Sequence, residues 1–200
     1  MTMDTYVETC REPFWQNIFK CELDFLVSAL QGSRDVLSVG CGPAIIEGGL
    51  NTHGFHITGL DISQEALKSS PDSVRTVAGR AEDMPFAEAS FDAVIYVASL
   101  QFIEDYRKAL QKSAATLRPS GKIIIMLLNL RSAFYKERSK NPDSYMNLIQ
   151  HKDSEQIERA VAECFTVHSE YMLGVSGIEI FTSNDPDEAA LYTIIGEKKG

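Results

Sequence analysis

Hydrophobic residues return every three or four positions along the first part of the chain, which is the spacing of an amphipathic helix. They run from Phe14 and Trp15 to Leu30, and Pro13 stands at a position that the first turn of a helix tolerates. We therefore predict a helix of roughly four turns in this segment. With the residues around it, this helix would form an N-terminal cap over residues 1–35.

From residue 36 onward, short apolar runs alternate with segments of helical character. The runs predict strands at residues 36–40, 56–62, 73–79, 91–100 and 121–130. Helices are predicted after the first strand, at 63–70 behind the capping residue Ser63, and at 104–117. The fourth and fifth strands are almost continuously apolar, as in a sheet that is buried on both faces. This alternation predicts an α/β fold with a doubly wound, mostly parallel sheet.

Beyond residue 130 the pattern changes. Residues 131–153 are polar and show no clear period, whereas residues 154–164 predict a helix with Ser154 as its N-cap. Two strand-like segments follow, at 165–175 and 188–198, with no long helix between them. We expect these segments to pair in the antiparallel sense and to close one edge of the sheet.

The composition is that of an ordinary soluble globular protein, with 44% hydrophobic and 24% charged residues among 200. We expect one domain over residues 1–200, since no repeat or linker interrupts the pattern. The 28 acidic side chains outnumber the 19 basic ones, and the net charge of -9 argues against nucleic acid as a partner. The basic residues Lys136, Arg138 and Lys140 are expected to lie in a solvated loop.

The sequence lacks the patterns of membrane insertion, export and metal binding. The longest apolar run, residues 123–128, is too short to cross a membrane, and no charged-then-apolar export signal opens the chain. His53 and His56 have no further ligand nearby, so no metal site is expected. Free thiols in a reducing cytoplasm are expected for the widely spaced cysteines Cys10, Cys21, Cys41 and Cys164.

Candidate chemistry begins at the turn Gly40-Cys41-Gly42, between the first predicted strand and the helix after it. Bare glycine backbone lets a ligand come close at such a turn. A nucleoside triphosphate is disfavoured, because the lysine and hydroxyl residue of a phosphate-binding loop are absent. A dinucleotide remains an alternative: Asp61 suits a ribose-binding acid, although bulky Ile45 replaces the third glycine. S-adenosylmethionine (SAM) is the other candidate, because it offers a ribose diol and carries no phosphates.

Four segments carry a family resemblance through their order and spacing. They are VLSVGCGPA, ITGLDIS, AGRAEDMPFAEASFDAVIYVASLQFI and ATLRPSGKIII, and they span roughly residues 36–128. Together they resemble the class I SAM-dependent methyltransferases, in particular the type 11 group that includes quinone-biosynthesis methyltransferases. The resemblance implies a Rossmann-like, mostly parallel seven-stranded sheet with an antiparallel C-terminal strand. It also implies methyl transfer from SAM to a small-molecule acceptor, with S-adenosylhomocysteine (SAH) as product.

The same resemblance implies which residues hold the cofactor. Asp61 would bind the ribose and Asp83 the adenine amino group, while Ile62 and Met84 would sandwich the adenine ring. Cys41 is expected to bring its backbone N–H near the ligand without acting as a nucleophile. The full set of expected cofactor-binding residues is Gly40, Cys41, Gly42, Asp61, Ile62, Glu82, Asp83, Met84 and Ala98.

The acceptor is expected where the fourth strand ends. Residues 129–153 would form a substrate lid, and His151, with Tyr135 and Tyr145, is the candidate base. On the other side the site would be closed by the N-terminal aromatic residues Tyr6, Phe14 and Trp15. The residues expected to face the acceptor are Ser99, Gln101, Tyr135 and His151.

Three positions depart from the family pattern. Ser38 replaces an acid that helps organise the loop and the methionine end of the cofactor. Ala44 replaces a glycine, which is tolerable if its φ angle is negative. Ser99-Leu100-Gln101-Phe102 stands where many relatives place a histidine. These departures leave open an alternative, a noncatalytic SAM-binding protein on the same fold, and the sequence specifies neither the acceptor nor the oligomeric state.

Overall fold

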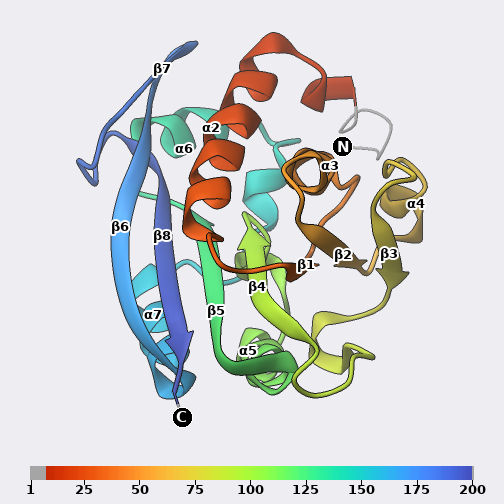
Figure 1. The fold of residues 1–200 in the computed structure, drawn as a ribbon. Coiled ribbons are helices and arrows are strands. Elements are labelled where there is room, and N and C mark those ends of the chain that lie inside the picture. Colours follow the sequence, from red (N-terminus) through yellow and green to blue (C-terminus); the bar gives the residue numbers. More distant parts are fainter. Residues whose placement is uncertain (1–7, 200) are drawn as a thin grey trace.

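The computed structural model describes residues 8–199, and within them one sheet of eight strands organises the fold (Figure 1). Its strand order is β3-β2-β1-β4-β5-β8-β6-β7. In this order, the strands from β3 to β5 are parallel to one another. At the other side of the sheet, β8, β6 and β7 each pair with the preceding strand of the order in the antiparallel sense. The strands are β1 (Asp35–Val39), β2 (His56–Asp61), β3 (Arg75–Ala78), β4 (Phe91–Val97), β5 (Leu117–Leu128), β6 (Phe165–Ser176), β7 (Glu179–Phe181) and β8 (Ala189–Lys198).

The predicted fold class is confirmed, with one strand more than expected. The additional strand is β7, which pairs with the end of β6 across a tight turn. Gly177 forms that turn with a φ of 62°, in the left-handed region that favours glycine. The predicted antiparallel pair corresponds to β6 and β8, and β8 joins it to the parallel strands through β5.

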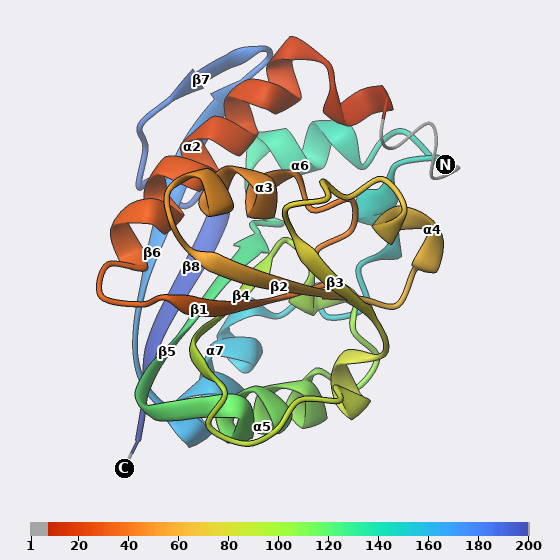
Figure 2. The same ribbon diagram turned by 45° about the vertical axis from the view of Figure 1, so that its right-hand side comes forward.

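Helices cover both faces of the sheet, with α2, α3 and α6 on one face and α5 and α7 on the other (Figure 2). The α-helices are α2 (Pro13–Ala29), α3 (Ile45–Thr52), α4 (Gln64–Leu67), α5 (Tyr106–Thr116), α6 (Ala133–Arg138) and α7 (Ser154–Cys164). Short 3-10 helices are η1 (Ala81–Asp83), η2 (Leu100–Phe102) and η3 (Tyr145–Leu148).

Two hydrophobic cores form because successive residues of a strand point to opposite faces. Along β5, Ile124 and Met126 pack in the core beneath α2 and α3, whereas Ile123 and Ile125 pack in the core beneath α5 and α7. This explains the almost continuous apolar character of β4 and β5. Burial on both faces fixes the sheet as a platform whose strand ends can carry a site.

The caps of two helices test the local predictions. Ser63 caps α4 as predicted, because its Oγ accepts a hydrogen bond from the Ala66 N–H at 3.2 Å. The cap predicted for α7 is wrong by one residue. Asp153 is the N-cap, and its Oδ1 accepts from the Gln156 N–H at 2.8 Å, while Ser154 already lies in the helix.

The segment after β5 is more ordered than its polar sequence indicated, since it contains α6 and η3. The expectation of a solvated loop is wrong for Arg138. Its guanidinium carbon lies 4.9 Å from the ring centre of Phe14 and 5.3 Å from that of Trp15, so cation–π contacts hold α6 against α2. No helix of residues 8–199 has the length and apolar character needed to cross a membrane.

The Asp153 cap predicts a measurable asymmetry between two neighbouring positions. Asp153→Ala removes the acceptor of the helix N-terminus and is expected to lower the free energy of unfolding by about 1 kcal/mol. Ser154→Ala leaves that acceptor in place and is expected to change it by less than about 0.5 kcal/mol. Urea unfolding of the two variants checks this, and an equal loss in both would contradict the assignment of the cap.

Candidate functional site

A cavity of about 1450 Å³ opens at the carboxyl ends of β1, β2 and β4, beneath α2, α6 and η3. It lies where the strand order reverses, because the chain runs from β1 outward to β2 and β3 and then returns to β4 on the other side. Open α/β sheets bind ligands at such a switch point. Single-ligand sites commonly measure about 300–1,000 Å³, so this cavity has room for two small molecules.

The glycine turn after β1 forms the floor of the cavity. Gly40 and Gly42 have φ angles of 74° and 53°. A Cβ on Gly40 would lie 2.5 Å from the Cβ of Ser99, so only glycine lets the turn pack against the end of β4. At Gly42 no atom lies within 4 Å of such a Cβ, and the backbone there is open to the cavity.

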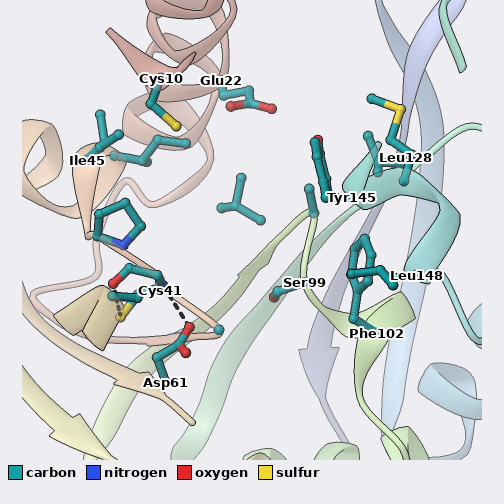
Figure 3. A pocket seen from close by; sticks show the side chains of 18 of the residues that line it. Cys10, Glu22, Cys41, Ile45, Asp61, Ser99, Phe102, Leu128, Tyr145 and Leu148 are labelled. Atoms are coloured by element: carbon teal, nitrogen blue, oxygen red, sulfur yellow. Dashed lines mark hydrogen bonds between the residues drawn. The ribbon is translucent and has the colours of Figure 1, made fainter. Parts of the chain in front are cut away.

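Asp61 fixes this turn from the end of β2. Its Oδ2 accepts a hydrogen bond from the Gly42 N–H at 2.8 Å (Figure 3). Its Oδ1 accepts from the Ser63 N–H at 2.8 Å. A carboxylate oxygen has further lone pairs, so Asp61 can still accept hydrogen bonds from a ligand. The next residue, Ile62, lines the cavity with 66% of its surface exposed and offers an apolar contact beside the carboxylate.

The acid missing at position 38 is supplied from α3. Ser38 Oγ donates a hydrogen bond of 2.5 Å to Glu47 Oε1, and both residues are buried. Burial raises the pKa of Glu47 to about 7, although the Ser38 hydroxyl acts in the opposite direction. Glu47 lines the cavity. Ser38 and Glu47 together therefore place a carboxyl group beside the end of β1 and at the cavity.

A second buried carboxyl, Glu22, reaches the cavity from α2. It is only 5% exposed, and among the described residues no group donates a hydrogen bond to it. Burial and, after it, the neighbouring Glu47 raise the pKa of Glu22 to about 8. Figure 3 places its carboxyl group at the end of the cavity opposite Asp61, on the side where the Tyr145 ring lies.

Cys41 serves the packing of the turn. A Cβ on Gly59 of β2 would lie 2.6 Å from the Cys41 Sγ, so the thiol occupies space that only glycine leaves free. Burial raises the pKa of this thiol well above its usual range, which keeps it protonated and unsuited to act as a nucleophile. The Cys41 N–H donates to the Leu60 carbonyl at 3.2 Å, and Cys41 lines the cavity, so its expected place near the ligand stays a prediction.

Two alanines beside the cavity adopt left-handed backbone conformations. Ala44, at the start of α3, has a φ of 54°, and Ala98, at the end of β4, has a φ of 46°. The condition set for Ala44, a negative φ, is therefore not met. Such a conformation costs an alanine roughly 1–2 kcal/mol. Strain of this kind gathers at functional sites, where the surrounding structure holds it in place.

The structure brings most of the expected cofactor residues together. The cavity is lined by Gly40, Cys41, Gly42, Asp61, Ile62, Glu82, Ala98 and also by Ser99. Asp83 and Met84 do not line it. The Asp83 side chain is 61% exposed and pairs with Lys108 Nζ at 2.7 Å, which lowers its pKa, while Met84 is buried in the core beneath α5 and α7.

Most of the expected acceptor residues are engaged elsewhere. Gln101 is fully buried and clamps Leu128, accepting from its N–H at 2.8 Å and donating to its carbonyl at 3.2 Å. His151 donates from Nε2 to the Ile103 carbonyl at 2.9 Å. Tyr135 packs against the core beneath α2. None of these three side chains lines the cavity, whereas Tyr145, Phe102 and Leu148 do. Tyr6 lies outside the described residues.

Glu22 and Glu47 are the cavity residues that the sequence patterns did not reveal. Glu22 lies four residues from both Ile18 and Leu26, so it occupies the centre of the buried face of α2. Glu47 follows Ile46 and precedes Leu50 on the buried side of α3. An acid within an apolar helix face was the available signal. Among residues 8–199, no group of three or more potential ligands is placed to hold a metal ion.

Comparisons with known sequences relate residues 37–125 to a methyltransferase domain family. O-methyltransferase rstn1 of Aspergillus nomiae is 37% identical over 114 residues, which cover 52% of this chain and 50% of the relative. The ubiquinone biosynthesis O-methyltransferase of Alkalilimnicola ehrlichii is 30% identical over 137 residues, which cover 64% of this chain and 51% of the relative. The chain thus spans about half the length of these curated relatives.

Solved structures show the same fold at low sequence identity. A SAM-dependent methyltransferase from Archaeoglobus fulgidus superposes with a TM-score of 0.78 at 17% identity, covering 99% of this chain and 100% of the other. A SAM-dependent methyltransferase from Thermotoga maritima gives a TM-score of 0.77 at 21% identity, with 90% and 89% covered. The likeness includes the helices and the antiparallel strands outside residues 37–125.

The two buried acids predict that stability falls as the pH rises. Their pKa values lie near 8 and 7 in the folded protein, against an ordinary value of 4.5, so the folded chain binds more protons than the unfolded chain across this window. The stability present below pH 4.5 is therefore lost progressively up to about pH 8. Glu22→Gln removes one of these titrations. It is expected to raise the free energy of unfolding at pH 8 by on the order of 4 kcal/mol, and to have little effect through this titration near pH 4.5.

Urea unfolding at pH 5 and pH 8 measures this difference. Asp24→Asn is the matched control, because Asp24 is an exposed acid on the same helix. It is expected to change the stability by less than about 0.5 kcal/mol at both pH values. A wild type and a Glu22→Gln variant that lose the same stability between the two pH values would contradict the raised pKa of Glu22.

Proposed function

We propose that this chain transfers a methyl group from SAM to a hydroxyl group of a small molecule, because residues 37–125 match a methyltransferase domain family and the chain has the fold of SAM-dependent methyltransferases. The observation that carries the proposal is Asp61. It holds the glycine turn and offers a carboxylate to the ribose diol in a cavity large enough for donor and acceptor. The names of relatives that are O-methyltransferases support a hydroxyl acceptor.

The charges around the cavity favour SAM over a dinucleotide. No lysine is found among the described residues that line it. Its arginines are engaged: Arg80 pairs with Glu82 and Glu104 at 3.0 Å each, and Arg138 stacks on the aromatic rings of α2. The buried carboxyls Glu22 and Glu47 offer no positive charge to a phosphate. A cofactor that carries a sulfonium and an ammonium group and no phosphate fits this set of charges better.

The remaining roles follow from position along the cavity. Asp61 binds the ribose, Ile62 packs against one face of the adenine, and the chain around Glu82 borders its edge. The backbone at Gly40, Gly42 and Ala98 contacts the methionine part. Glu47, through Ser38, restores the acid that the first strand lacks, which favours a catalytic protein over a noncatalytic binder.

The chain's own contribution to the transfer is orientation and exclusion of water. SAM supplies a methyl group on a positively charged sulfur that leaves as a neutral thioether. Among the described residues, α2 acts as the cap and residues 129–153 as the lid of a single domain, with α2, α6 and η3 closing the cavity from above. The free cysteines suit a cytoplasmic location, and the acidic composition suits a small-molecule acceptor rather than a nucleic acid.

Ligand-dependent thermal unfolding tests the proposal. SAM or SAH at 100 times its dissociation constant is expected to raise the midpoint by about 5–10 °C, and NAD is expected to leave it unchanged. Asp61→Ala is expected to weaken SAH binding at least tenfold, as it removes hydrogen bonds to a charged group. Asp83→Ala is the control, expected to leave the affinity within twofold, because Asp83 lies outside the cavity.

Two results would contradict the proposal. The first is a folded protein whose midpoint moves with NAD and not with SAM or SAH. The second is an Asp61→Ala variant that binds SAH as tightly as the wild type.

A further inference from the structure

We propose that Glu22 is the general base of the transfer and that the acceptor is a phenol-type hydroxyl carried on a flat apolar molecule. This inference rests on the proposed methyl transfer and extends it to the acceptor. Glu22 lies on the third turn of α2, and its carboxyl group is buried at the cavity end opposite Asp61 (Figure 3). That end is the place left for the acceptor when the ribose lies at Asp61.

The lack of a donor for Glu22 points to a ligand. A buried carboxylate is costly unless a donor satisfies it, and none of the described residues donates to Glu22. Glu47 differs, because Ser38 already donates to it. A ligand hydroxyl entering this end of the cavity would supply the missing donor.

Other side chains at this end cannot accept the acceptor proton as readily. Ser99 donates its hydroxyl to the Val39 carbonyl at 2.6 Å, and the imidazole of His151 is bound to Ile103 outside the cavity. Burial and Glu22 raise the pKa of Tyr145, so its phenol stays protonated.

The other carboxyl groups of the cavity are exposed or already engaged: Glu82 pairs with Arg80, Glu47 accepts from Ser38 and Asp61 holds the glycine turn. The exposed ones are Glu12, Glu104, Glu137 and Asp143, which leaves Glu22 as the buried carboxyl without a donor among the described residues.

The surroundings of Glu22 set both its proton affinity and the kind of acceptor. The titratable and charged groups facing this region are Glu47 on α3, Tyr145 on η3, Arg138 on α6 and Cys10 ahead of α2. Burial and Glu47 bring the Glu22 pKa to about 8, within reach of a phenol at about 10 but far from an aliphatic alcohol. The apolar lining at this end favours a flat ring, and it includes Trp15, Phe19, Phe102, Phe134 and Leu148.

The methyl transfer is a displacement at the methyl carbon. The acceptor oxygen forms a bond to the methyl carbon, while the bond from that carbon to sulfur breaks and leaves its electron pair on sulfur. The proton of the acceptor hydroxyl passes to the Glu22 carboxylate and then to solvent. No oxidant, reductant or metal ion enters the balance.

Two phenols distinguish a base from a merely structural residue. 2-Naphthol keeps its proton at pH 8 and needs a base, whereas 4-nitrophenol is largely ionised in solution and needs none. Wild type is expected to methylate both. Glu22→Gln is expected to lose at least about 100-fold in kcat/KM for 2-naphthol and less than about fivefold for 4-nitrophenol. Asp24→Asn, an exposed site on the same helix, is the control and is expected to match wild type with both phenols.

Two further measurements do not depend on the size of the rate. Carbon-13 NMR of glutamate-labelled protein is expected to show one carboxyl that titrates above pH 7, that is absent in Glu22→Gln, and that shifts when 2-naphthol is added with SAH. Glu47→Gln keeps an acceptor for Ser38 and removes the like charge. It is expected to move the titration of the Glu22 carboxyl, followed by the same carbon-13 signal, to lower pH, because Glu47 is the neighbouring charge that raises the Glu22 pKa.

The outcomes separate this inference from the proposed function. A Glu22→Gln variant that still binds SAH and loses the same factor in kcat/KM with both phenols would overturn Glu22 as the base. A variant that loses no activity with either phenol would overturn it as well. A wild type that binds SAH and methylates neither phenol would overturn the acceptor class while leaving the cofactor site intact. A wild type that does not bind SAH would overturn the proposed function, and with it this inference.

Discussion

The backbone N–H of Gly42 donates a hydrogen bond to the carboxylate of Asp61, and this contact ties the turn after β1 to the end of β2. The same turn is held from below by the Leu60 carbonyl, which accepts from Gly40 and Cys41, and from the side by Ser99 of the β4 end. Three strand ends are thereby fixed relative to one another. Because Asp61 spends only part of its hydrogen-bonding capacity on the turn, one residue can both shape the site and bind the ligand.

The cavity also concentrates features that a stable fold would avoid. Ala44 and Ala98 beside the cavity have positive φ angles, and the buried carboxyls of Glu22 and Glu47 have only one hydroxyl donor between them. Each of these costs free energy, which the double hydrophobic core of the sheet offsets. Local departures from good packing and hydrogen bonding gather where binding or chemistry needs them. Here they lie at the end of β4, at the start of α3 and on the buried face of α2.

Much of the fold could be read from the sequence because its signals are local. The apolar runs of β4 and β5, the Ser63 cap and the glycine turn each depend on residues close together in the chain. Asp61 was predictable for the same reason, since it directly ends a strand. The position of the Asp83 side chain could not be predicted, because a single 3-10 turn decides which of the two adjacent acids faces the cavity. That turn directs Glu82 inward and Asp83 toward Lys108.

The acceptor side required the tertiary structure. Gln101 follows strand four and His151 lies in the lid segment, but hydrogen bonds to Leu128 and Ile103 hold both side chains away from the cavity. Glu22 becomes part of the cavity only because α2 packs across α3 and brings it beside Glu47.

A crystal structure of the complex with SAH tests the central claim most directly. The account predicts the ribose hydroxyls on the Asp61 carboxylate, the adenine against Ile62, and the homocysteine sulfur directed toward the end of the cavity that holds Glu22 and Tyr145. A ligand bound away from Asp61, or one whose sulfur points away from Glu22, would contradict it.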